Sequence, residues 1–236
     1  MSGPSGVLAA LEVRLGAFGL SCRGVLRFED GHAAPPLAEG EPASAVVLVG
    51  VAGGAMWPIF GAWREAQGDG GGSDPLDRWS KLVIDAVAGE FGASACYPSE
   101  PPYQPFQTWA MRAEGLKPSP LRILIHPRFG LWHSYRGALL FRDWRDEIAA
   151  SETVAHPCAA CADKPCRSAC PVGAISENGF DVARCRQHLL TPVGQGGCMV
   201  SGCLARNACP VGVDFRYPVA QLGFHMQALT LPVSQC

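Results

Sequence analysis

The chain contains 236 residues and has a formal net charge of −2 at pH 7, so it suits one large domain or two smaller ones. Its 19 Lys and Arg residues form no run that would track phosphates, which argues against a nucleic-acid partner. No apolar stretch reaches the roughly eighteen residues of a membrane span. No basic residue precedes Arg14 and no apolar signal core lies before it. We therefore expect a cytoplasmic protein with no nucleic-acid partner and no membrane partner.

The first third of the chain alternates between predicted helices and strands. Residues 8–20 place apolar side chains at helical spacing, and residues 25–28 predict a short strand. The run AVVLVGV at 45–51 is continuously apolar, which is typical of a strand covered on both faces. It is the best candidate for a central strand, and residues 57–67 predict the helix that follows it.

The next predicted helix begins after Asp74. Asp74 is expected to be its N-cap, and Pro75 occupies the first helical position. The apolar spacing then predicts a buried stripe made of Leu76, Trp79, Leu82, Val83, Ala86 and Val87. A further helix is predicted over residues 106–114.

Two more apolar runs, at 121–126 and 138–141, predict strands separated by a loop at 127–137. The loop concentrates polar and aromatic side chains, namely Arg128, Trp132, His133, Tyr135 and Arg136. Such groups on a loop between buried strands favour a binding role. Within this region His126 and His133 are candidate proton donors because histidine titrates near neutral pH, although a structural role is favoured for both.

The cysteines carry the clearest chemical signal. Eight of eleven lie in two runs, each ending in Ala-Cys-Pro-Val-Gly. The first run consists of Cys158, Cys161, Cys166 and Cys170, and the second of Cys185, Cys198, Cys203 and Cys209. Eight thiolates suffice for two 4Fe-4S clusters, and in two-cluster ferredoxins the cysteine before proline ligates the other cluster. That rule groups Cys158, Cys161 and Cys166 with Cys209, and Cys185, Cys198 and Cys203 with Cys170.

Two other uses of cysteine are less favoured. A structural zinc site usually closes with paired cysteines at short spacing and gives no reason for a proline after the last cysteine of both runs. A disulfide framework requires an oxidising compartment, for which the sequence shows no export signal. The first run departs from the commonest ferredoxin spacing by two additional residues, in the stretch Asp163-Lys164-Pro165.

Two segments of the first half resemble the cobalamin-processing family, whose members strip the upper ligand from cobalamin as decyanases and dealkylases. They are LIHPRFGLWHSYRGALL at 124–140 and DPLDR at 74–78. With the two-cluster domain that follows, the whole arrangement is similar to epoxyqueuosine reductases and reductive dehalogenases. The resemblance covers most of residues 10–141 and implies a nitroreductase-like fold, with a corrinoid beside an intrinsic 4Fe-4S cluster.

The same resemblance implies roles for three residues of the 127–137 loop. Arg136 matches an arginine that binds the thiol cosubstrate in the family, which implies a catalytic and cofactor-binding role. Gly130 and Trp132 match pocket-forming positions, which implies contact with the corrinoid. A guanidinium also suits an oxyanion, since it donates two parallel hydrogen bonds. The alternative for Arg136 is a structural salt bridge near the end of a strand.

We therefore expect an α+β protein with a nitroreductase-like domain over residues 1–150 and a dicluster ferredoxin-like domain over residues 151–236. The leading hypothesis is a corrinoid-dependent reductase or cobalamin-processing enzyme. Its two 4Fe-4S clusters would pass electrons to a bound cobalamin, and a flavoprotein or ferredoxin would serve as electron donor. The alternatives are a dicluster ferredoxin-type electron-transfer protein without corrinoid, and a flavin enzyme of the same fold.

Overall fold

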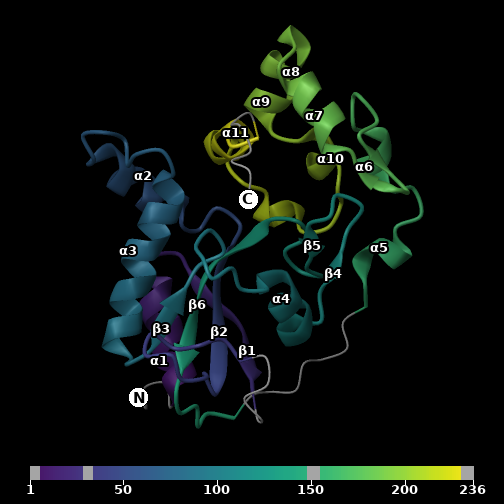
Figure 1. The fold of residues 1–236 in the computed structure, drawn as a ribbon. Helices are drawn as coiled ribbons and strands as arrows, with labels where there is room; N and C mark the ends of the chain where they lie inside the picture. The colour runs from purple at the N-terminus through teal and green to yellow at the C-terminus, as the bar shows by residue number, and fades with distance from the viewer. Residues whose placement is uncertain (1–5, 29–33, 148–154, 230–236) are drawn as a thin grey trace. The chain divides into compact units, whose positions relative to one another are not determined.

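A computed structural model of the chain describes residues 6–28, 34–147 and 155–229, and it divides into two compact units (Figure 1). The sheet unit contains Met1–Gly115 and His133–Thr153, and the cysteine unit contains Leu116–Trp132 and Val154–Cys236. The boundary expected between residues 150 and 151 lies outside the described residues. Residues 116–132, which we expected in the first domain, belong to the cysteine unit. No helix in the described ranges is long and apolar enough to cross a membrane.

The sheet unit is built on four antiparallel strands in the order β1-β2-β6-β3. Their bounds are β1 (Ser21–Arg27), β2 (Ala45–Ala52), β3 (Ser94–Cys96) and β6 (His133–Phe141). The first seven residues of β2 are buried, as the unbroken apolar run predicts for a central strand covered on both faces. Both neighbours of β2, which are β1 and β6, pair with it in antiparallel register. The unit also contains helices, so the expected mixture of helix and sheet is present.

The helices of this unit are α1 (Val7–Gly16), α2 (Trp57–Glu65), α3 (Pro75–Glu90) and α4 (Phe106–Glu114). Helix α2 packs on α3. Helix α3 packs on β6 and β3, α1 packs on β1 and α3, and α4 packs on β1 (Figure 1). The predicted stripe of α3 is correct at four of its six positions, since Leu82 and Ala86 are exposed. Asp74 precedes α3, but its carboxylate accepts a hydrogen bond from Ser73 Oγ and not from a helix amide.

The largest difference from the prediction concerns β6. It begins at His133 instead of residue 138, so His133, Tyr135 and Arg136 lie in a strand and not in a loop. The mixed polar character of residues 133–136 hides the strand from a hydrophobicity pattern, because His133 is a buried polar residue and residues 134–136 are only partly covered. The predicted strand at 121–126 shrinks to β5 (Leu124–Ile125), which pairs with β4 (Lys117–Pro118) outside the main sheet.

The cysteine unit consists of short elements. Its helices are α5 (Pro157–Ala160), α6 (Pro165–Ser168), α7 (Val182–Leu189), α8 (Pro192–Gly196), α9 (Cys198–Ser201), α10 (Leu204–Asn207), η1 (Val213–Phe215) and α11 (Val219–Gln227), and its second hairpin is β7 (Ile175–Ser176) with β8 (Gly179–Phe180). Four of these helices have only four residues. Helices this short have little intrinsic stability, so tertiary packing has to hold them in place.

Candidate functional site

The first group of cysteines surrounds a pocket in the cysteine unit. Cys158, Cys161, Cys166 and Cys209 all line it, and the rest of its wall is largely apolar, with Pro157, Pro165, Pro210, Leu121, Ile125 and Leu131. Burial raises the pKa of the Cys158 thiol, and the neighbouring Cys209, Cys166 and Cys161 thiols raise it further. Four sulfur donors in an apolar wall form a ligand set and a dielectric environment suited to an iron-sulfur cluster.

The second group gathers the remaining four cysteines of the two runs. Burial raises the pKa of Cys185 to about 11, with additional contributions from Cys203, Cys170 and Cys198. Cys198 is buried with Leu189 and Met226, and Cys185 and Cys203 pack against that cluster. Both groups therefore contain three cysteines of one run and the cysteine-before-proline of the other. This membership is the same as in the crosswise rule of two-cluster ferredoxins, while the role of these cysteines as ligands stays a prediction.

The backbone around the sulfurs supplies hydrogen-bond donors. The Ala174 N–H donates to Cys170 Sγ at 3.2 Å, and the Val211 N–H lowers the pKa of Cys209 against the larger effect of burial. Amide donors of this kind stabilise thiolate over thiol and tune the potential of a bound cluster. Across the described ranges, no three His, Cys, Asp or Glu side chains converge on one point as ligands of a single metal ion.

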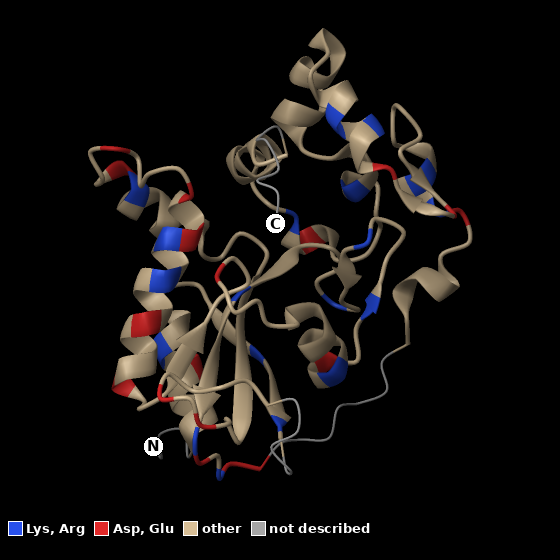
Figure 2. Ribbon diagram, viewed as in Figure 1, with Lys and Arg blue, Asp and Glu red and all other residues tan. Residues whose placement is uncertain are grey.

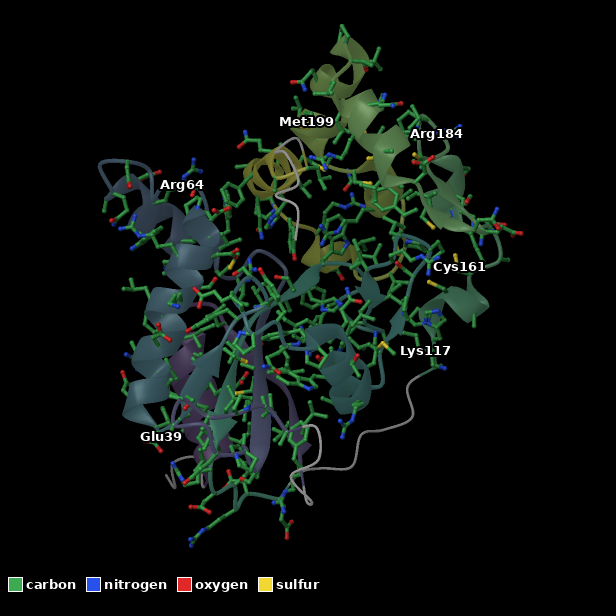
Figure 3. All side chains as sticks on the ribbon, viewed as in Figure 1. Glu39, Arg64, Lys117, Cys161, Arg184 and Met199 are labelled. Atoms are coloured by element: carbon green, nitrogen blue, oxygen red, sulfur yellow. The ribbon has the colours of Figure 1, made fainter. Side chains whose placement is uncertain are left out.

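Lys164 occupies an unusual position beside the first group, in the stretch that lengthens the first run. Its backbone is left-handed, with φ at 40°. Its ammonium donates to the carbonyl oxygens of Cys158 at 2.8 Å and Cys161 at 2.9 Å. A positive charge is thus held over the loop of two predicted ligands (Cys161 is labelled in Figure 3). The two additional residues of this run therefore place a cation and two hydrogen bonds beside the thiols.

The two units carry opposite net charges (Figure 2). The residues of the cysteine unit include nine Lys and Arg against four Asp and Glu, which gives +5, while the sheet unit has ten against seventeen, which gives −7. Four thiolates in each group would bring a concentrated negative charge into the cysteine unit. Two of these basic residues act on the thiols directly: against the larger effect of burial, Lys164 lowers the pKa of Cys158 and Arg167 lowers the pKa of Cys166, because a nearby positive charge favours the thiolate.

Gly130 and Gly212 allow two turns of the cysteine unit to touch. Gly130 has φ at 58° and Gly212 has φ at 70°, a region that residues with side chains rarely adopt. A Cβ on Gly130 would overlap the Val211 carbonyl, and one on Gly212 would overlap the Phe129 carbonyl. The glycine that ends the second Ala-Cys-Pro-Val-Gly motif thus packs against the turn that contains Gly130. The expected contact between Gly130 and a corrinoid stays a prediction. The close approach to the Val211 carbonyl explains on structural grounds why a glycine occupies this position.

Trp132 lies in the interior of the cysteine unit. It is fully buried and clusters with Tyr217 and Leu222. The Arg206 guanidinium lies 4.5 Å from its ring centroid and donates a hydrogen bond to the Leu131 carbonyl at 2.5 Å. Such an arrangement combines cation–π attraction with burial of a large apolar ring. Gly130 and Trp132 are therefore brought together in one unit, whereas Arg136 belongs to the other.

Arg136 is the additional residue of a β-bulge in β6. Val49 pairs with Gly137 and Gly50 pairs with Tyr135, so the register with β2 skips Arg136. Bulges re-aim side chains and are common beside active sites. Here the guanidinium forms an ion pair with Asp77 at 3.2 Å, and the arginine side chain is 15% exposed. This is the salt bridge that we considered as the alternative role.

A second arginine bulge lies on the other side of β2. The register of β1 shifts between Cys22 and Gly24, so Arg23 is its additional residue. Its side chain, only 3% exposed, forms an ion pair with Glu114 at 2.9 Å and donates to the Val51 carbonyl at 3.2 Å. It is thus held by the end of α4 and by the central strand at once.

Glu114 connects this arginine to β6. Tyr135 Oη donates to Glu114 Oε1 at 2.5 Å, and His133 Nδ1 lies 3.5 Å from Arg23 Nη2. Burial raises the pKa of Glu114, and the Arg23 charge opposes that shift. The buried network of Arg23, Glu114, Tyr135 and His133 thus connects β1, α4 and β6. It is the principal polar feature that the sequence did not reveal.

The sequence does contain a signal for both bulges. Each of the strands β1, β2 and β6 contains one isolated glycine, namely Gly24, Gly50 and Gly137. An isolated glycine inside a strand indicates a bulge or a close backbone approach. A Cβ on Gly50 would overlap the Ser134 carbonyl. Nothing in the sequence, however, indicates that Arg23 and Glu114, which are 91 residues apart, form a pair.

The two described cysteines outside the runs lie in the sheet unit and are half-buried. Burial raises the pKa of Cys96 to about 12 and raises the pKa of Cys22 as well, with a smaller contribution from Glu12. A thiol must ionise to act as a nucleophile. Both cysteines therefore remain protonated at neutral pH and serve as small packing residues.

No protein-family model matches the sequence, and no curated protein matches it significantly. Among solved structures, the C. elegans B12-trafficking protein CblC, a human MMACHC homologue, matches with a TM-score of 0.53 at 13% identity, over 95% of this chain and 90% of that one. The chain therefore has a fold similar to that of CblC, with mixed helix and sheet. The ferredoxin-like character of the cysteine unit stays a prediction.

Two epoxyqueuosine reductase structures also match at 13% identity. One is bound to an epoxyqueuosine-modified tRNA-Tyr stem loop and has a TM-score of 0.49, and the other is from Bacillus subtilis and has a TM-score of 0.48. Each alignment covers 89% of this chain and 66% of the reductase. The chain thus spans about two thirds of the length of these reductases. The absence of a nucleic-acid partner stays an expectation.

Proposed function

We propose that the chain is an iron-sulfur oxidoreductase that holds two 4Fe-4S clusters and delivers their electrons to a corrinoid bound by the sheet unit. The observation that carries the proposal is the grouping of the eight cysteines into two sets of four. Bound cubanes supply single electrons at low potential, about −400 mV for the low-potential types. Reduction of cobalt requires a donor of this kind.

The residues of the cysteine unit have three tasks in this scheme. Cys158, Cys161, Cys166 and Cys209 would hold one cluster, and Cys170, Cys185, Cys198 and Cys203 would hold the other. Apolar residues such as Ile125 and Leu131 keep water from the first group. Lys164 and the surrounding amides would stabilise the negative charge of the thiolates.

Support for the corrinoid comes from the fold and from β6. The CblC structure belongs to a B12-trafficking protein, and the segment at 124–140 resembles the cobalamin-processing family. In the sheet unit, the Arg136 guanidinium would bind a carboxylate or amide oxygen of the ligand once Asp77 releases it. Tyr135 and His133 lie on the same strand, where the Glu114 network fixes the orientation of both side chains.

One observation favours a second function, that of a dicluster electron carrier without corrinoid. Arg136 is already paired with Asp77, while Gly130 and Trp132 have packing partners inside the cysteine unit. The three residues expected to form the corrinoid pocket therefore each have a structural role in the described chain. A carrier needs only the cysteine groups and a surface for its redox partners.

The test is iron analysis and visible spectroscopy of the anaerobically purified chain, with hydroxocobalamin added before and after dithionite. We expect about eight iron atoms per chain, as two cubanes require, and a stoichiometric corrinoid spectrum that changes on reduction. Arg136→Met should weaken corrinoid binding, whereas Arg64→Met, on α2, should not. Eight iron atoms without corrinoid binding would establish the carrier function, and a chain that binds no iron would refute both functions.

A further inference from the structure

A groove on the cysteine unit is lined by basic side chains from separate segments. Arg122, Lys164 and Arg167 line it together with His156, and Cys158 and Ala159 also contribute to its wall. The only acidic residue in its lining is Glu177, which forms an ion pair with Arg167 at 2.7 Å while remaining 84% exposed. We call this surface the basic groove. Its three permanent cations attract a negatively charged partner.

The basic groove and the pocket of the first cysteine group share a wall. Cys158, Lys164, Ser119 and Pro120 line both. Cys158 and Cys161 are half-buried, whereas Cys166 and Cys209 are buried, and of these four cysteines Cys158 alone lines the groove. A protein that occupied the groove would thus lie against Cys158, the member of the first cysteine group that lines it. Electron transfer requires such an approach, because the donor must be brought near the acceptor.

The backbone at the basic groove is strained. Within the described residues, Arg122 and Lys164 are the two non-glycine residues with positive φ, at 63° and 40°. Each such conformation costs about 1 to 3 kcal/mol and is typical of functional positions. The strain at Lys164 is compensated by its hydrogen bonds to two carbonyls. Both strained residues are basic, and both face the same groove, which indicates that the placement of these charges serves a function.

We propose that the basic groove is the docking site of an acidic one-electron carrier protein that reduces the first cysteine group's cluster. The inference rests on the proposed function, because it assumes that this group holds a cluster. In the proposed step the carrier loses one electron and the cluster gains it, and no proton or chemical group is transferred. An acidic carrier is favoured over a basic one because the lining of the groove contains three permanent cations and one carboxylate.

The experiment measures the rate of cluster reduction by stopped-flow spectroscopy, with the hydroquinone of an acidic flavodoxin as donor. The test variant is Arg122→Glu with Arg167→Glu in the full chain. The matched control is Arg184→Glu with Arg186→Glu on α7, beside Cys185 (Arg184 is labelled in Figure 3). Both variants change the net charge equally, but only the first alters the basic groove. Affinity for oxidised flavodoxin, measured by titration, provides a second readout.

We expect the groove variant to reduce the second-order rate constant at low salt about tenfold or more, and the control by less than twofold, because steering depends on local charge. The difference should shrink as salt screens the charges. Reduction by the methyl viologen radical cation should not slow in the groove variant, since this donor is positively charged. Equal slowing of both variants, or slowing of the control alone, would refute the groove as the docking site.

Loss of structure is separated from loss of docking by iron content and by the viologen rate. If the double Glu variant loses iron, Arg122→Gln with Arg167→Gln replaces it, with a smaller expected decrease of about threefold at low salt, since each site loses one charge instead of two. A wild-type chain that binds no iron refutes the proposed function. A chain that binds iron and is reduced equally in all variants refutes only the docking site.

Discussion

Replacing Arg23 by Met removes the cation from the buried network of the sheet unit. Arg23 and Glu114 have side chains only 3% and 11% exposed and lie 2.9 Å apart. Removing one partner of such a pair leaves an uncompensated buried charge, which costs about 3 to 5 kcal/mol. We therefore expect Arg23→Met to lower the free energy of unfolding of the sheet unit by this amount at pH 8, measured by urea denaturation of the full chain.

The loss should depend on pH. Burial already raises the pKa of Glu114 above its ordinary value of 4.5, and Arg23 is the first of the effects that oppose this shift. Without Arg23 the folded-state pKa rises further. A carboxyl whose pKa is raised in the folded state stabilises the fold at pH values below its unfolded-state pKa. That contribution is lost as pH rises through the folded-state pKa, and it amounts to about 1.4 kcal/mol for each unit by which the two pKa values differ. The variant should therefore recover stability as pH falls from 8 towards 5.

Two variants separate this mechanism from others. Glu114→Gln represents the protonated carboxyl, so Arg23→Met with Glu114→Gln should show little recovery between pH 8 and pH 5. His133 also faces Arg23, and recovery that persists in the double variant would assign the effect to a group other than Glu114. Arg14→Met breaks the exposed pair with Glu90 and should change stability little. A loss in Arg23→Met that is equal at both pH values would refute the reasoning.

Three further predictions concern the cysteine unit. Lys164→Met should lower the reduction potential of one cluster by roughly 60 mV, the equivalent of a tenfold change in a one-electron equilibrium, and leave the other unchanged in an EPR-monitored redox titration. In Cys209→Ser the Lys164-sensitive signal should disappear, whereas in Cys170→Ser it should remain, and the reverse pattern would refute the crosswise grouping. Gly130→Ala should lower the free energy of unfolding by more than about 1 kcal/mol, while Gly61→Ala, which has open space around its Cβ position, should not lower it.

Regular elements with a single strong pattern could be predicted from the sequence. The central strand appears at β2 within one residue of its prediction, and α4 has the predicted bounds. These segments depend on local periodicity and burial, which a single sequence displays. The grouping of cysteines could also be proposed, because the spacing and the following prolines carry a chemical rule that does not depend on the rest of the fold.

Positions fixed by distant contacts could not be predicted. Strand β6 begins five residues early because β2 extends alongside it, and its register includes a bulge at Arg136. Arg23 is placed inside the sheet unit by a bulge in β1 and by a carboxylate 91 residues away. A hydrophobicity pattern describes neighbours in sequence, so it assigns a buried arginine to the surface. Only the isolated strand glycines carry a trace of this arrangement.

The segment that resembles the cobalamin-processing family has two structural roles, and this affects how far the resemblance supports a corrinoid. Its first part belongs to the cysteine unit, where Ile125 and Leu131 line the first cysteine pocket and Gly130 packs on Val211. Those residues are accounted for by packing alone. The part that remains for a ligand is β6, where Arg136 forms an ion pair with the partly exposed carboxylate of Asp77. If the proposed corrinoid binds at β6, a ligand oxygen has to compete with Asp77 for the Arg136 guanidinium, and the Arg136→Met titration tests whether that guanidinium contributes to binding.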